Sequence, residues 1–143
     1  MTTCVVDANV AAKWLLPAAG EDLLDQANHL LARHIRRGLQ LLAPDLIEAE
    51  LGNVLRKAVR HNRINPLEAQ NALRHFASLS VQIVPTSDLL LPALKIAVSC
   101  NVSFYDSLYV VLAVASNTEL VTADERLVNT LGSRFPVRWL GVF

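Results

Sequence analysis

The sequence predicts an α/β fold with a mainly parallel sheet, and three observations predict it. Short β-branched or apolar runs recur along the chain, longer segments with helical spacing separate them, and this alternation continues to the end. The 143 residues suit one domain over residues 1–143. Because 52% of the residues are hydrophobic, much of the chain must be buried or must face a partner.

In the first half of the chain, proline, glycine and capping residues separate the expected elements. These are a strand over residues 3–6, a helix from Asp7 or Asn9 to Pro17, a helix over residues 21–37, a strand over residues 39–43 and a helix from Pro44 to about Arg60. The strands are β-branched or apolar runs, and the helices carry apolar stripes. Pro44 suits the first turn of a helix, and Gly38 suits the end of one.

In the second half, the same alternation continues to the last residues. The expected elements are a helix from Asn65-Pro66 to about Leu79, a strand over residues 81–84, a helix over residues 87–99, a helix from Ser103 or Tyr105 to about Ser116, a strand over residues 119–122, a helix from Asp124 to Leu131 and a strand over residues 137–140. Strands joined through helices in this way favour parallel pairing.

Composition limits the function classes. Thirteen basic and thirteen acidic residues give zero net charge, so any contact with nucleic acid is expected to be local and partly carried by a metal ion. Cys4 and Cys100 stand outside any zinc motif, and a cytoplasmic location is expected. No apolar run reaches membrane-spanning length, and the N-terminal residues lack the basic start of a signal peptide. The four histidines show no ligand spacing and are expected at the surface.

Carboxylates follow the ends of the expected strands, where open parallel sheets bind ligands. Asp7 ends the first strand, Asp124 follows a later one, and Asp106 lies in the first turn of an apolar helix. Glu50 shares a helix face with Lys57. Taken singly, the aspartates could serve as caps or favour a helix dipole, and Glu50 could pair with Lys57 in solvent.

Taken together, these acids indicate a metal site. Carboxylates that converge on one sheet edge repel each other, and a divalent cation removes this penalty. Since no cysteine or histidine adjoins these acids in the sequence, an all-oxygen site is expected, which suits Mg²⁺ or Mn²⁺.

Four segments resemble, in order, the four motifs of PIN domains. They are residues 5–10 with Lys13-Trp14-Leu15, residues 44–55, residues 105–109 and residues 120–127. The resemblance is strongest to the toxin half of bacterial and archaeal VapBC toxin–antitoxin pairs. It implies a three-layer α/β/α sandwich with a mainly parallel central sheet, metal-dependent hydrolysis of RNA phosphodiester bonds, homodimerisation and inhibition by a small antitoxin protein.

By position, the resemblance assigns the catalytic and metal-site residues as Asp7, Glu50, Asp106 and Asp124. Asp7 and Asp106 are the expected direct ligands of Mg²⁺ or Mn²⁺, with the other two acids holding metal-bound waters. The expected supporting residues are Asn9, Asn53 and Thr122, and Lys57 is the expected phosphate contact. Glu48 is a rival for Glu50, which is preferred because it precedes Asn53 by three residues.

Two other functions remain open at this point. One is a non-catalytic PIN-like module that binds RNA or protein. The other is a phosphatase of the haloacid-dehalogenase type, which also has an Asp after its first strand. That phosphatase chemistry needs a second acid two residues later, where this sequence has Asn9.

Overall fold

Five parallel strands form one sheet at the centre of the computed structural model, which describes residues 2–143. The strands are β1 (Thr2–Val6), β2 (Leu39–Pro44), β3 (Gln82–Val84), β4 (Leu120–Thr122) and β5 (Val137–Trp139). They lie in the order β3-β2-β1-β4-β5, and every neighbouring pair is parallel. The predicted α/β class with a parallel sheet is therefore confirmed.

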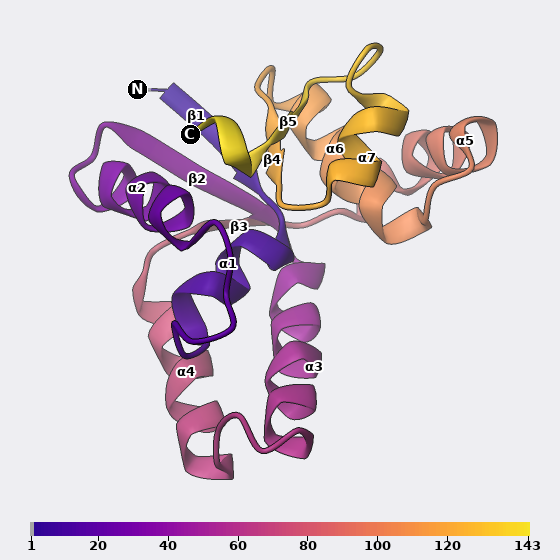
Figure 1. The fold of residues 1–143 in the computed structure, drawn as a ribbon. Helices are drawn as coiled ribbons and strands as arrows, with labels where there is room; N and C mark the ends of the chain where they lie inside the picture. The colour runs from indigo at the N-terminus through magenta and orange to yellow at the C-terminus, as the bar shows by residue number, and fades with distance from the viewer. Residues whose placement is uncertain (1) are drawn as a thin grey trace.

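Helices connect the strands along the chain. They are α1 (Ala8–Leu15), α2 (Leu24–Ile35), α3 (Leu46–Arg60), α4 (Pro66–Ser78), α5 (Leu90–Cys100), α6 (Phe104–Ala115) and α7 (Glu125–Leu131), with short 3₁₀ turns η1 (Ser87–Leu89) and η2 (Leu140–Val142). Of the helices, α1, α2, α6 and α7 pack against the sheet, whereas α3 and α4 extend away from it (Figure 1). The strand order reverses beside β1. Because crossovers between parallel strands are right-handed as a rule, the helices that lead to β2 and β3 belong on one face of the sheet and those that lead to β4 and β5 on the other. The predicted three-layer sandwich is confirmed.

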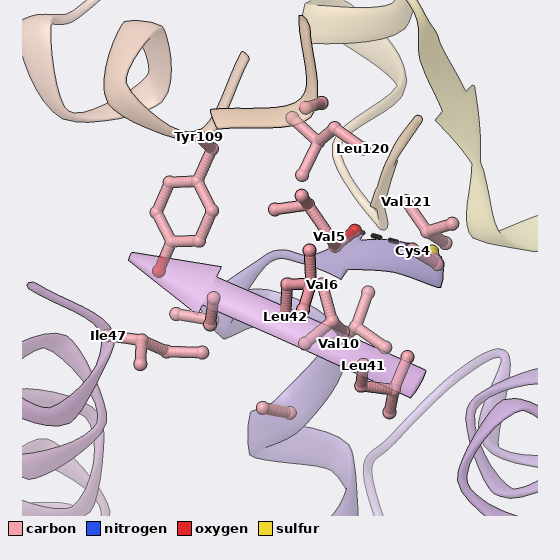
Figure 2. Packing of buried hydrophobic residues seen from close by; sticks show 14 of the residues in the cluster. Cys4, Val5, Val6, Val10, Leu41, Leu42, Ile47, Tyr109, Leu120 and Val121 are labelled. Carbon is pink, nitrogen blue, oxygen red and sulfur yellow. Dashed lines mark hydrogen bonds between the residues drawn. The ribbon is translucent and has the colours of Figure 1, made fainter. Parts of the chain in front are cut away.

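The core lies along β1, β2 and β4 and beneath α6, which packs on all three strands. Val5, Val6, Leu41, Leu120 and Val121 are completely buried there (Figure 2). In α6, every residue from 107 to 113 is buried, which accounts for the strongly apolar sequence of that helix. The high hydrophobic content of the chain therefore serves first to enclose the central strands.

The helix predicted to begin at Pro44 begins instead at Leu46, and Pro44 is the last residue of β2, opposite Val84. Proline lacks an N–H group, but β1 pairs with β2 only as far as Leu42, so Pro44 interrupts no bond to β1. The Asp45 N–H donates to the Val84 carbonyl at 3.0 Å and continues the ladder for one more residue. Tertiary pairing therefore overrides the local preference for a helix start.

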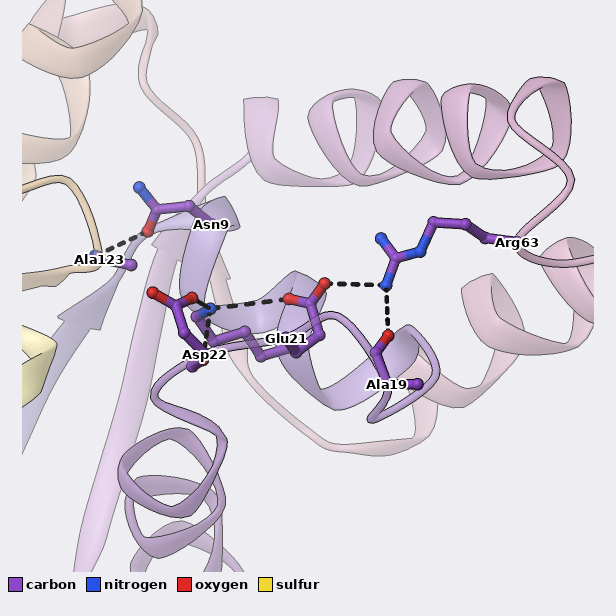
Figure 3. A network of polar contacts seen from close by, with 7 residues as sticks. Asn9, Ala19, Glu21, Asp22, Arg63 and Ala123 are labelled. Atoms are coloured by element: carbon purple, nitrogen blue, oxygen red, sulfur yellow. Dashed lines mark hydrogen bonds and ion pairs between the residues drawn. The ribbon is translucent and has the colours of Figure 1, made fainter.

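The helix predicted to begin at Glu21 begins at Leu24, because ion pairs hold the preceding residues in a loop (Figure 3). The buried Lys13 places Nζ 2.9 Å from Asp22 Oδ1 and 3.6 Å from Glu21 Oε1. Arg63 donates to Glu21 Oε2 at 3.0 Å. This network ties the loop after α1 to α1 itself and to the loop between α3 and α4.

The prediction that all four histidines lie at the surface is wrong for His34, which has 8% of its surface exposed. The Leu41 N–H donates to His34 Nδ1 at 3.2 Å, so the ring proton lies on Nε2, which donates to the Leu79 carbonyl at 2.7 Å. One imidazole therefore joins the end of α2, the start of β2 and the end of α4.

Within residues 2–143, no single helix is long and apolar enough to cross a membrane. One pair of helical segments is long and apolar enough only when the two are taken together, and they are bent by 119° relative to each other: Ser87–Cys100 and Phe104–Ala115. Cys4 and Cys100 are both free thiols, and Cys4 is buried as the sequence predicts.

Candidate active site

Asp7 lies directly after β1, at the carboxyl end of the sheet and beside the reversal in strand order. It occupies the N-cap position of α1, but its side chain makes no capping hydrogen bond. Instead, Oδ2 accepts a hydrogen bond of 2.9 Å from the Thr122 hydroxyl, and only 6% of the residue surface is exposed. Asp7 therefore holds the predicted N-cap position, but its carboxylate bonds to the end of β4 instead of capping the helix.

Thr122, the last residue of β4, joins the ends of the two central strands. Its buried hydroxyl donates to Asp7 and accepts hydrogen bonds from Asn9 Nδ2 and the Asp124 N–H, both at 3.1 Å. Asn9 Oδ1 accepts from the Ala123 N–H at 3.0 Å (Figure 3). The structure thus places the Thr122 hydroxyl against Asp7 and the Asn9 amide against Thr122, and their supporting role stays a prediction.

Glu50 comes to the same edge from α3 and is half-buried. Its Oε1 accepts a hydrogen bond of 2.6 Å from the hydroxyl of Tyr109, whose ring extends from α6 past the end of β2 (Figure 2). The rival Glu48 is exposed and lines a separate cavity with Arg74 and Phe76. Helix α3 therefore turns Glu50, and not Glu48, towards Asp7.

Asp106 and Asp124 line one cleft of about 420 Å³ between the first turns of α6 and α7. Asp106 lies in the first turn of α6, and its N–H donates to the Ser103 hydroxyl that caps the helix. Asp124 caps α7, with Oδ1 accepting from the Arg126 N–H at 3.0 Å. Asp124 therefore performs the capping role that the sequence allowed and also lines the cleft.

The four acids interact electrostatically. Burial raises the pKa of Asp7 from 3.8 to about 7, the hydrogen bond from Thr122 opposes this rise, and the charges of Asp106 and Glu50 add to it. Burial also raises the pKa of Glu50 and of Asp106, with further increases from Asp106 and Asp124 respectively. The charge of each acid thus acts on at least one other acid or is acted on by it, as expected for carboxylates gathered at one edge of the sheet.

The donor set fits a divalent cation that keeps part of its water shell. The converging groups are carboxylates, the oxygen ligands that Mg²⁺ and Mn²⁺ prefer. In the part of the chain that the structure describes, no three Asp, Glu, His or Cys side chains lie close enough to ligate one ion together. A cation here would therefore bind one or two carboxylates directly and reach the others through water, which is usual for Mg²⁺.

Two residues predicted for the site, Asn53 and Lys57, contact none of the four acids within residues 2–143. Asn53 is exposed, and its Oδ1 accepts from Arg56 Nε at 3.4 Å rather than contacting an acid. Lys57 is exposed on α3 and forms no ion pair within residues 2–143. By contrast, Arg126 lines the acidic cleft although the sequence analysis did not single it out. Its position two residues after Asp124, inside the fourth motif, could have indicated from the sequence that Arg126 lies near the acids.

Comparison with known proteins points to one family. A family model described as the PIN domain matches residues 4–131. VapC ribonuclease Mb0985 of Mycobacterium bovis is 33% identical over 133 residues, covering 93% of this chain and 94% of that protein. Ribonuclease VapC1 of Mycobacterium tuberculosis is 35% identical over 132 residues, covering 92% and 93%.

Two solved structures share the fold. PAE2754 from Pyrobaculum aerophilum superposes with a TM-score of 0.70 and 25% identity, covering 99% of this chain and 85% of that one. VapBC2 from Rickettsia felis, solved bound to a DNA fragment from its promoter, gives a TM-score of 0.67 over 96% of this chain and 98% of that one. At 16% identity, this second likeness concerns the fold alone.

Proposed function

This chain belongs to the PIN-domain family, and we propose that it cuts RNA with the help of a Mg²⁺ or Mn²⁺ ion held between Asp7 and Asp106. Because it is similar to VapC ribonucleases along almost the whole chain, we assign it as the toxin ribonuclease of a toxin–antitoxin pair. The observation that carries the metal site is the burial of the Asp7 carboxylate beside other acids, with no cationic side chain of residues 2–143 paired to it.

The roles proposed for the four acids are those that their positions in the PIN-domain motifs imply. Asp7 and Asp106 would ligate the cation directly, and Glu50 and Asp124 would hold water molecules beside it, one of them placed to act as the nucleophile. A bound Mg²⁺ or Mn²⁺ supplies charge stabilisation at the phosphate and lowers the pKa of that water. The Thr122 hydroxyl fixes the Asp7 carboxylate in one orientation, so this ligand is in place before substrate binds.

The cleft between α6 and α7 is the proposed path of the RNA backbone. Arg126 lines this cleft together with Asp106 and Asp124, yet it forms an ion pair with neither. It also lies in the first turn of α7, where the helix dipole disfavours a cation. A phosphate in the cleft gives the guanidinium a partner, so we assign the phosphate contact first to Arg126 and second to Lys57.

The proposed partners are a small antitoxin protein and a second copy of the chain, in the cytoplasm. Exposed apolar side chains on α5, namely Leu91, Leu94 and Val98, support association because such patches are unusual on isolated monomers. Family membership sets aside the phosphatase alternative. The non-catalytic alternative is decided by an activity measurement.

That measurement is cleavage of a labelled single-stranded RNA by the purified protein. Cleavage should require Mg²⁺ or Mn²⁺ and stop with EDTA, and Asp7→Asn and Asp106→Asn should both be inactive while remaining folded by circular dichroism. Asp88→Asn, at an exposed position on η1, is the matched control and should cleave normally. Full activity in either site variant, or equal cleavage by all of them, would refute the proposal.

A further inference from the structure

The strongest unexplained contact at the site is the hydrogen bond between Tyr109 and Glu50. We propose that Tyr109 is a positioning residue, whose hydroxyl holds the Glu50 carboxylate towards Asp7 and so sets how tightly the site binds its cation. This inference rests on the proposed function, because it gives a role to a residue beside the proposed metal ligands.

The geometry of the contact is specific. Tyr109 and Glu50 belong to different helices, α6 and α3, and the phenol oxygen lies 2.6 Å from Glu50 Oε1. This is the short distance expected when an O–H group donates to a charged carboxylate. Within residues 2–143, Glu50 Oε2 accepts no hydrogen bond from the protein, so one oxygen is anchored and the other is available to a cation or its water.

Packing alone does not explain a tyrosine at this position. Its ring belongs to the main hydrophobic cluster, and only 1% of the residue is exposed. Phenylalanine would fill the same space without bringing a hydroxyl into the core, where a polar group is costly unless it is hydrogen-bonded. The hydroxyl is satisfied by Glu50, a flexible and half-buried side chain that would otherwise sample several rotamers. The ordering of Glu50 is therefore the specific consequence of the hydroxyl.

Tyr109 is also well placed along its own helix. It follows Asp106 by three residues, so successive turns of α6 present an acid and a hydroxyl to the same side. Burial, the charge of Asp7 and the hydrogen bond to Glu50 all raise the pKa of Tyr109, so its hydroxyl keeps its proton and acts as a donor. Helix α6 thus contributes one proposed ligand and the group that orients another acid.

The test is a double-mutant cycle on Mn²⁺ binding, measured by electron paramagnetic resonance without RNA. Tyr109→Phe should weaken Mn²⁺ binding roughly 10–100-fold, the usual effect of removing a group that orients a metal-holding residue. Glu50→Ala should also weaken it, and the double variant should bind no more weakly than Glu50→Ala alone. Tyr105→Phe, on the same helix but 62% exposed, is the control and should bind like wild type.

A second cycle avoids the metal. In EDTA, the shifts in urea midpoint caused by Tyr109→Phe and Glu50→Ala should not add, because each variant removes the same contact. Unchanged Mn²⁺ affinity in Tyr109→Phe, or losses that multiply in the double variant, would overturn the inference. Wild-type protein that binds Mn²⁺ with this non-additive pattern but cleaves no RNA would instead refute the ribonuclease proposal and leave the role of Tyr109 standing.

Discussion

The buried carboxylate of Asp7 predicts that the substitution Asp7→Asn stabilises the metal-free protein at neutral and alkaline pH. In the unfolded chain this carboxyl ionises near its ordinary pKa of 3.8, whereas burial and neighbouring charges raise the pKa in the folded protein to about 7. Well below pH 3.8 it is protonated in both states and costs nothing. As the pH rises towards 7, the folded state retains a proton that the unfolded state has lost, so stability falls.

The size of this stability change follows from the difference between the folded and unfolded pKa of Asp7. About three pKa units correspond to roughly 4 kcal/mol at 1.36 kcal/mol per unit. In Asp7→Asn, the N–H donors of the new side-chain amide are buried without partners, which costs about 1–3 kcal/mol at every pH. The net gain in the free energy of unfolding at pH 8 is therefore about 1–3 kcal/mol. Because that cost is constant, the stability of Asp7→Asn relative to wild type should rise by about 2–3 kcal/mol between pH 5 and pH 8.

Urea denaturation in EDTA at pH 5 and pH 8 measures this difference. Asp88→Asn is the control and should show no such rise, since Asp88 is exposed on η1. Saturating Mn²⁺ should reverse the order by stabilising wild type by about 3 kcal/mol at a hundredfold excess over Kd, with no gain in Asp7→Asn. If the variant were less stable than wild type at pH 8 in EDTA, or if the difference were independent of pH, the argument from burial would be refuted.

Three further predictions concern residues around the acids and in the core. Arg126→Ala should raise KM for RNA about tenfold with kcat retained, because one charged phosphate contact is lost, and Lys57→Ala should change KM less. Thr122→Val should weaken Mn²⁺ binding roughly tenfold, measured by paramagnetic resonance, because Asp7 loses its orienting hydroxyl. His34→Phe should lower the free energy of unfolding in urea by about 2–4 kcal/mol, because two buried backbone groups lose their partner.

Each of these has a result that contradicts it. A larger effect of Lys57→Ala than of Arg126→Ala would move the RNA path from α7 to α3. Normal Mn²⁺ affinity in Thr122→Val would mean that burial alone orients Asp7. Unchanged stability of His34→Phe would mean that water replaces the imidazole at the backbone groups it bonds.

Much of the fold was accessible to sequence reasoning because the elements agree locally and globally. The apolar run before Asp7, the capping Asn65-Pro66 and the apolar stretch of α6 carry the same signal in isolation as in the folded chain. Asp7 and Asp124 could be placed at one edge because they follow parallel strands, and the carboxyl ends of parallel strands meet.

Other features depend on contacts that no local pattern contains. Pro44 suits a helix start, but pairing with β3 keeps it in β2. His34 lies on a helix with an exposed polar side, and only the return of distant segments buries it. Tyr109 gives no signal of its own, since its role arises where α3 brings Glu50 against α6. The sequence predicted the four acids and Thr122 as a supporting residue, whereas the contact between Tyr109 and Glu50 required the tertiary structure.

The central claim, that acids distant in the chain share one cation, is tested most directly by anomalous scattering from crystals grown with Mn²⁺. We predict a single Mn²⁺ peak at the carboxyl end of the sheet, bonded to the Asp7 and Asp106 carboxylates and joined through water to Glu50 or Asp124. A peak bound only elsewhere on the protein, or an acid site that stays empty at saturating Mn²⁺, would contradict the account.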